Sequence, residues 1–126
     1  MNENKKKVMI VEDDEHISKV YEIKLAKEGF ATSLAVDGEE AVKKITIEKP
    51  DLILLDLMIP KKDGFGVLED IKKIPELAGI PVIVLSNLGQ HTDQDRALAL
   101  GANEYLVKVD YPIQEVVNRV KGYLAQ

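Results

Sequence analysis

The chain has no cysteine, so it forms no disulfide and offers no thiolate metal ligand and no thiol nucleophile. Chains without cysteine are typical of the reducing cytoplasm, and we expect a cytoplasmic protein. The chain also lacks any apolar stretch near the roughly 20 residues that a membrane helix requires. The apolar run after Lys5–Lys7 is too short for a signal peptide and leads straight into acidic residues. We therefore expect a soluble protein with no membrane partner.

An excess of positive charge is also missing. The formal net charge is −5, with acidic and basic residues intermixed, so we expect no direct binding of nucleic acid. The nucleotide-binding patterns GxxxxGK(S/T) and GxGxxG are absent as well. What is present is 126 residues that are 45% hydrophobic, enough for one core. We expect a frayed segment at residues 1–6 and a single domain over residues 7–126.

Five short apolar runs alternate with five segments of helical periodicity. The expected strands are Val8–Val11, Ala31–Ala35, Leu52–Leu55, Pro81–Leu85 and Glu104–Val107. Strands that alternate with helices pair in parallel through right-handed crossovers. The sequence therefore predicts an α/β fold: a single doubly wound, five-stranded parallel sheet of flavodoxin-like order 2-1-3-4-5, with helices on both faces. The second strand is the most polar and suits an edge.

The helical segments carry apolar stripes and recognisable ends. The first has its stripe at Ile17, Val20, Tyr21 and Leu25 and ends at Gly29. The others are expected after Asp37-Gly38, after Asp63-Gly64, from about Thr92 to Leu100 before Gly101, and from Pro112, in the first turn, to Leu124.

Carboxylates stand where two of the apolar strands end. Glu12 and Asp13 follow the first strand, and Asp56 follows the third. In the predicted order these strands are neighbours, about 4.8 Å apart, and ligands bind beyond their carboxyl ends. Three carboxylates so close repel one another unless a cation compensates them. A site with few carboxylates that is open to solvent suits Mg²⁺ better than Ca²⁺. Taken alone, solvated strand-end acids remain the alternative interpretation.

Two more strand ends deliver a hydroxyl, Ser86, and an ammonium, Lys108. The fifth strand lies about 10 Å from the third, a gap that only a long side chain such as lysine covers. Asp56 is then a carboxylate nucleophile able to form an acyl phosphate. Mg²⁺, Lys108 and the Ser86 hydroxyl would stabilise the phosphoryl oxygens. The sequence predicts phosphoryl transfer to Asp56 from a molecule that carries an activated phosphate.

Four segments together resemble the receiver domain of bacterial two-component response regulators, of the kind found in chemotaxis regulators. They are Val11–Asp14, Leu54–Pro60 with Asp63-Gly64, Leu85-Ser86, and Gly101–Lys108. The resemblance spans essentially the whole chain. It implies that Asp56 accepts a phosphoryl group from a sensor histidine kinase or a phosphotransfer protein. It implies Mg²⁺ ligands at Glu12, Asp13, Asp56 and the Met58 backbone carbonyl, and phosphoryl-contacting and switch roles for Ser86, Lys108 and Tyr105.

The resemblance also implies a switch. A phosphoryl group adds close to two negative charges, draws Ser86 toward it and lets Tyr105 swing inward. The fourth helix, fifth strand and fifth helix then repack and report the signal. Self-association through this face is possible on the same grounds, with Arg96, Tyr105 and Tyr111 as candidate contacts. A stand-alone regulator, a relay intermediate and a receiver cut from a longer protein all stay open, as does the output target.

Several residues depart from the family pattern. Val109 stands where most receivers have a proline, often in cis, and both isomers of the Lys108–Val109 bond stay open. Met58 and Leu88 flank the phosphorylation pocket, and our hypothesis is that they shield the acyl phosphate from water. Asn87 is bulkier than usual and restricts access for a partner. The two histidines, His16 and His91, are expected on the surface.

Two other functions compete with the switch. A haloacid-dehalogenase-like phosphatase also uses a strand-end aspartate and Mg²⁺, but it requires a second aspartate two residues later, where this chain has Met58. A receiver-like interaction module that is never phosphorylated has no need of the intact acid set, Ser86 and Lys108. We expect no enzyme beyond self-catalysed phosphoryl transfer and autodephosphorylation.

Overall fold

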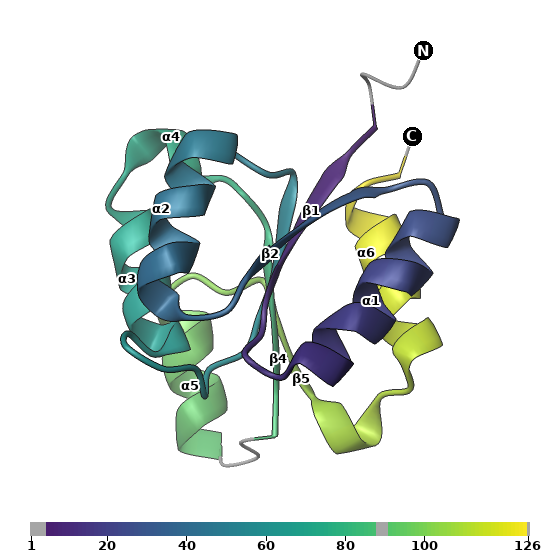
Figure 1. Cartoon of the computed structure of the whole chain (residues 1–126). Coiled ribbons are helices and arrows are strands. Elements are labelled where there is room, and N and C mark those ends of the chain that lie inside the picture. The colour runs from purple at the N-terminus through teal and green to yellow at the C-terminus, as the bar shows by residue number, and fades with distance from the viewer. Residues whose placement is uncertain (1–4, 88–90, 126) are drawn as a thin grey trace.

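The computed structural model describes residues 5–87 and 91–125. Its strands form one parallel sheet in the order β2-β1-β3-β4-β5 (Figure 1). The strands are β1 (Lys7–Val11), β2 (Ala31–Ala35), β3 (Leu52–Leu55), β4 (Val82–Ser86) and β5 (Glu104–Val107). The predicted fold class, strand order and edge position of β2 are confirmed. The predicted fraying of residues 1–6 stays a prediction, because residues 1–4 lie outside the described part of the chain.

Helices cover both faces of the sheet. They are α1 (Glu15–Lys27), α2 (Gly38–Glu48), α3 (Gly64–Lys72), α4 (Pro75–Ala78), α5 (His91–Ala99), the short 3-10 helix η1 (Lys108–Asp110) and α6 (Ile113–Tyr123). Figure 1 shows α1 and α6 side by side on one face, and α2, α3 and α5 on the other. No helix in the described ranges is both long and apolar enough to cross a membrane.

Several strands are continuously apolar because helices cover the sheet on both faces. Successive side chains of a strand point to opposite faces. Val8 and Ile10 pack in the cluster that includes Leu25 of α1 and Val117 of α6. Met9 and Val11 lie instead in the cluster that includes residues of α2, α3 and α5. From Val8 onward both faces of β1 are buried, which is why these positions are apolar, and the same alternation runs through β3 and through β4 as far as Leu85.

Several details differ from the sequence predictions. Neither α4 nor η1 is predicted, because four residues and three residues are too few to show a helical period. The strand β4 begins and ends one residue later than expected, and Ser86 is its last residue. The helix α5 is shifted by one residue, within the usual uncertainty of helix ends. Pro112 occupies the position before α6 and not its first turn.

Aspartate side chains start the helices that follow the first three strands. Asp14 accepts backbone hydrogen bonds from His16 and Ile17 at the start of α1. Asp37 accepts from the Glu40 N–H at the start of α2, and Asp63 accepts from the Gly66 N–H at the start of α3. Each carboxylate satisfies a backbone N–H that the helix itself cannot pair. The three helix N-termini are thereby fixed at the edge where the strands end.

Two glycines let these helix starts approach the loop that follows β3. A Cβ at Gly38 would lie 1.8 Å from the carbonyl oxygen of Lys62, and a Cβ at Gly64 would lie 2.7 Å from the carbonyl oxygen of Asp56. Both neighbours are backbone atoms, which cannot rotate away. The first residues of α2 and α3 are therefore glycine because the loop backbone occupies the space of any side chain.

We predict that Gly38→Ala lowers the free energy of unfolding by about 2 kcal/mol or more, because α2 must move away from Lys62. Gly122→Ala is the control. A Cβ at this exposed position in α6 would meet nothing within 4 Å, and alanine should add about 0.5–1 kcal/mol. Urea unfolding followed by circular dichroism measures both values. Equal stability of the two variants would contradict the close approach.

Candidate phosphorylation site

The candidate site begins where β1 and β3 end side by side. These strands pair with Val11 opposite Leu55. The pairing continues one step further, because the Asp56 N–H donates to the Val11 carbonyl at 3.1 Å. On the other side of β1, the Glu12 N–H donates to the Ala35 carbonyl at 3.0 Å. The backbone of Glu12 and of Asp56 is thus held by the sheet, and their side chains emerge at one edge.

Three carboxylates meet at this edge. One oxygen each from Glu12, Asp13 and Asp56 lies within 4.8 Å of the other two. Glu12 and Asp56 are 5% and 7% exposed, whereas Asp13 is exposed. Buried acids this close are stable as anions only beside positive charge. Oxygen donors from two neighbouring strands, open to solvent on the Asp13 side, fit a hard divalent cation.

Lys108 already supplies positive charge to this cluster. Its Nζ donates to Glu12 Oε1 at 2.6 Å and to Asp56 Oδ2 at 3.1 Å. The lysine follows β5, so its side chain crosses the width of β4 to reach Asp56. Only 13% of the side chain is exposed. The sequence predicts the contact with Asp56, but the shorter contact with Glu12 was not expected.

Burial and pairing compete in setting the pKa values of this pair. Burial raises the pKa of the Glu12 carboxyl above its ordinary value, even though the hydrogen bond from Lys108 opposes the shift. Burial also acts to lower the pKa of Lys108, but the hydrogen bond to Glu12 and the charge of Asp56 outweigh it and raise that pKa. Lys108 therefore stays protonated. Glu12 is the member of the pair whose charged form is destabilised by burial on balance.

Backbone donors complete the arrangement. The Met58 N–H donates to Asp56 Oδ1 at 3.1 Å, and the Asp14 N–H donates to Glu12 Oε2 at 3.1 Å. Each buried carboxylate therefore accepts one backbone bond and one bond from Lys108. Fixed donors around the Asp56 carboxylate hold it in one orientation, which is what an attack on a phosphoryl group requires.

The family model described as "Response regulator receiver domain" matches residues 8–121. The chain belongs to this family. It is 39% identical over 124 residues to "Probable transcriptional regulator ycf27" of Cyanophora paradoxa, which covers 98% of this chain and 50% of that protein. The chain thus spans about half the length of the curated relatives that it matches. Magnesium-dependent phosphorylation of an aspartate is typical of the family.

Solved receiver domains share the fold closely. The receiver domain of the Francisella response regulator 1452 superposes with a TM-score of 0.86 at 32% identity, covering 94% of this chain and 95% of that chain. The cyanobacterial phytochrome response regulator RcpA, in its phosphorylated form, also gives a TM-score of 0.86, at 33% identity, covering 96% and 95% of the two chains. The resemblance inferred from sequence is confirmed.

The two predicted switch residues of this receiver domain are buried. Ser86 ends β4 with no exposed surface, and Tyr105 in β5 is 8% exposed. Burial raises the pKa of the Tyr105 phenol, and the charges of Asp93 and Asp56 add to the shift. Tyr105 therefore already points into the protein here, so the predicted inward swing is not required to bury it.

The residues expected to flank the pocket differ in exposure. Met58 is 58% exposed, and Asn87 is exposed just after β4. Leu88 lies outside the described residues. Val109 is 82% exposed, and no peptide bond among the described residues is cis, so the Lys108–Val109 bond is trans. Both histidines are exposed, as predicted.

Sequence reasoning missed one residue that borders the site. Tyr21 of α1 belongs to the predicted apolar stripe, but it also lines a small cavity together with Glu12 and Asp56. Burial raises the pKa of its phenol, the charge of Lys108 opposes this shift, and Glu12 adds to it. A tyrosine within a stripe of aliphatic residues was the available signal.

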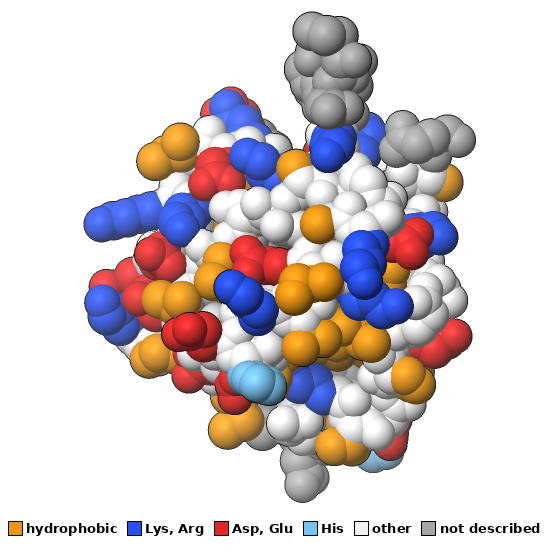
Figure 2. Space-filling model, turned by 45° about the vertical axis from the view of Figure 1, so that its right-hand side comes forward, with side chains coloured by type: hydrophobic (Ala, Val, Ile, Leu, Met, Phe, Trp, Pro, Cys, Tyr) orange, Lys and Arg blue, Asp and Glu red, His pale blue; other side chains and the backbone are white. Residues whose placement is uncertain are grey.

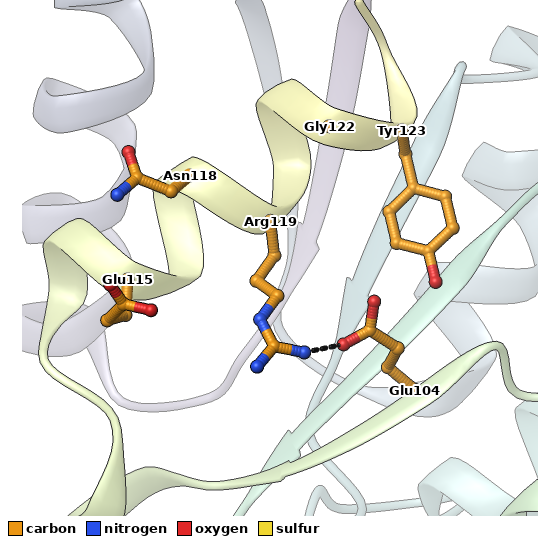
Figure 3. A pocket seen from close by; sticks show the side chains of 6 residues that line it. All are labelled: Glu104, Glu115, Asn118, Arg119, Gly122 and Tyr123. Carbon is orange, nitrogen blue, oxygen red and sulfur yellow. Dashed lines mark hydrogen bonds and ion pairs between the residues drawn. The ribbon is translucent and has the colours of Figure 1, made fainter.

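The face predicted to carry the output consists of α5, β5 and α6, which are the predicted fourth helix, fifth strand and fifth helix. Several of its side chains already contact other residues of the protein. Arg96 lies over the Phe65 ring, 4.1 Å from its centroid, and Arg119 lies 5.4 Å from the centroid of Tyr111. Arg119 also pairs with Glu104, toward which Tyr123 points from the end of α6 (Figure 3). Glu104, Arg119 and Tyr123 border a shallow hollow beside β5. Any partner on this face must compete with these internal contacts.

We predict that Lys108→Met destabilises the metal-free protein by at least about 2 kcal/mol, because Glu12 and Asp56 lose their shared cation. Magnesium should then stabilise the variant more than it stabilises the wild type, since the cation replaces the ammonium. Urea unfolding in EDTA and in Mg²⁺ measures both effects. Lys121→Met, which breaks only the exposed pair with Glu28, is the control and should change stability by less than about 1 kcal/mol. An equal loss in both variants would contradict this account.

Proposed function

We propose that Asp56 is the phosphoacceptor of this receiver domain and that a phosphohistidine on a sensor histidine kinase or phosphotransfer protein is the donor. The observation that carries the proposal is the Lys108 ammonium within hydrogen-bonding distance of both Glu12 and Asp56. In the transfer, the phosphorus–nitrogen bond of the donor breaks as a carboxylate oxygen of Asp56 binds the phosphorus. An acyl phosphate results.

The proposed metal is Mg²⁺. The carboxylates of Glu12, Asp13 and Asp56 would hold it together with the backbone carbonyl of Met58, and it supplies positive charge to the phosphoryl oxygens. Lys108 contributes the second positive charge. Its ammonium needs only to exchange one oxygen partner for another to contact a phosphoryl group on Asp56, because it already lies 3.1 Å from Oδ2. Glu12 then keeps the bond from the Asp14 N–H.

The proposed readout runs through β4 and β5 to the α5–β5–α6 face. The Ser86 hydroxyl would donate to the phosphoryl group, and Tyr105 would report the movement of Ser86 to α5. A homodimer through this face, with Arg96, Tyr105 and Tyr111 as contacts, is the proposed assembly. The contacts of Arg96 with Phe65 and of Tyr111 with Arg119 would then rearrange. The downstream target is a protein.

We propose no enzymatic role beyond self-catalysed phosphoryl transfer and autodephosphorylation. A phosphatase of the haloacid-dehalogenase type requires an acid two residues after Asp56, and the exposed side chain there is Met58. Direct nucleic-acid binding by this domain is not part of the proposal, because acidic and basic side chains are interspersed on the face in Figure 2 and the net charge is −5. The proposed location is the cytoplasm, for which a chain without cysteine is typical.

Incubation with acetyl phosphate and Mg²⁺ should add one phosphoryl group, seen by intact mass, and Asp56→Asn should abolish the gain. Asp51→Asn is the matched control. Asp51 precedes β3 and so lies at the opposite end of the strand from Asp56. There it accepts from the Lys7 N–H at 2.7 Å, a bond that asparagine retains. A gain that survives Asp56→Asn would refute the assignment. Multiple-turnover release of phosphate without a lasting gain in mass would favour the phosphatase instead.

The lifetime of the acyl phosphate should depend on the residues that flank it. Met58 is 58% exposed, and its N–H donates to Asp56 Oδ1. We predict that Met58→Asn and Leu88→Glu each speed the loss of the phosphoryl group by roughly threefold or more, because they admit and orient water. The decay of phosphorylated protein, followed by intact mass after removal of the donor, measures this. Unchanged decay in both variants would exclude shielding.

A further inference from the structure

The loop after β3 contains a backbone turn that is rare for its residue. The Lys62 N–H donates to the Pro60 carbonyl at 2.8 Å, which closes a three-residue turn around Lys61. Lys61 has a φ of 71°. Residues other than glycine seldom adopt positive φ, and such a conformation persists only where surrounding contacts hold it. The question is what holds Lys61.

The start of α2 supplies the contacts. The Gly38 N–H donates to the Pro60 carbonyl at 3.1 Å, so this carbonyl accepts from both sides. The Lys61 ammonium lies 3.6 Å from Asp37 Oδ2, while Oδ1 of the same carboxylate caps α2 through the Glu40 N–H at 2.7 Å. Asp37 is 8% exposed and held on both oxygens. We name this set of contacts, between Asp37 and Gly38 on one side and Pro60 and Lys61 on the other, the α2 clamp.

The α2 clamp holds the loop that carries part of the candidate site. At its start, the Met58 N–H donates to Asp56 Oδ1, and at its end the Gly64 N–H donates to the Leu57 carbonyl at 2.9 Å. Between these anchors, Pro60 and Lys61 contact α2, and the Lys62 ammonium pairs with Asp70 of α3 at 2.7 Å. The contacts with α2 are therefore the ones nearest in sequence to Met58.

We propose that Asp37 and Lys61 are positioning residues for the phosphorylation site: their ion pair holds the strained turn and so fixes the loop at Met58. The part of this proposal that concerns metal and phosphoryl binding rests on the proposed function of Asp56. The part that concerns the loop itself does not. Neither residue touches the reacting atoms.

The position of the clamp gives it a separate role from the output face. The strand β2, which leads into Asp37, is at one edge of the sheet, and β5 is at the other. A partner that displaces the start of α2 therefore acts on the loop at Met58 without contacting the α5–β5–α6 face.

The test compares substitutions at Lys61. Lys61→Gln removes the ion pair and leaves the positive φ, and Lys61→Arg restores the charge. Lys62→Gln is the matched control, because Lys62 pairs with Asp70 of α3 at 2.7 Å and not with α2. In the metal-free protein, hydrogen exchange of the Gly38 and Lys62 amides should quicken by roughly threefold in Lys61→Gln, and Lys61→Arg should restore it. Calorimetry should give a similarly weakened affinity for Mg²⁺ in Lys61→Gln alone.

A second pair of variants separates a clamp from a general loss of stability. Asp37→Asn keeps the helix cap, because asparagine also accepts from the Glu40 N–H. If the clamp exists, Asp37→Asn in the Lys61→Gln background causes no further change in either measurement. Additive effects, or exchange at Gly38 and Lys62 that changes no more than at the Val120 amide in α6, would overturn the proposal. Failure of the wild type to take a phosphoryl group refutes only the function of Asp56, since the metal-free exchange still decides on the clamp.

Discussion

The ammonium of Lys108 between two buried carboxylates is the interaction on which the site depends. Glu12 and Asp56 are delivered to one edge by neighbouring parallel strands, so the fold itself forces two anions together. Burial then raises the pKa of Glu12. Lys108 offsets this repulsion across the width of β4. The same charge that stabilises the two carboxylates without metal is therefore the charge that a phosphoryl group on Asp56 would require.

The fold could be predicted from the sequence because the three central strands β1, β3 and β4 are buried on both faces. A run such as Leu52–Leu55 has no polar position, which identifies a central parallel strand, and the strand ends then locate Asp56 and Lys108. The Glu12–Lys108 bond could not be predicted, since its length depends on how a flexible side chain settles. The short helix α4 has too few residues for a period, and the turn at Lys61 has no glycine to mark it.

The internal pairings of the α5–β5–α6 face bear on how a signal leaves the domain. Arg96 rests on Phe65 of α3, and Arg119 joins Glu104 of β5 to α6. These contacts tie α5 to α3 and α6 to the sheet. A partner that uses either arginine must displace an existing contact. The proposed change in β5 on phosphorylation would therefore need to supply only the difference in free energy between the internal contacts and those with the partner.

A crystal structure of the protein with Mg²⁺ and beryllofluoride tests the central claim most directly, because it places the phosphoryl mimic and the ammonium in one map. The account predicts beryllofluoride on a carboxylate oxygen of Asp56, with the Lys108 Nζ moved from Glu12 to a fluorine atom and Mg²⁺ among Glu12, Asp13 and Asp56. Beryllofluoride on another residue, or a Lys108 ammonium that remains on Glu12 and makes no contact with the mimic, would contradict it.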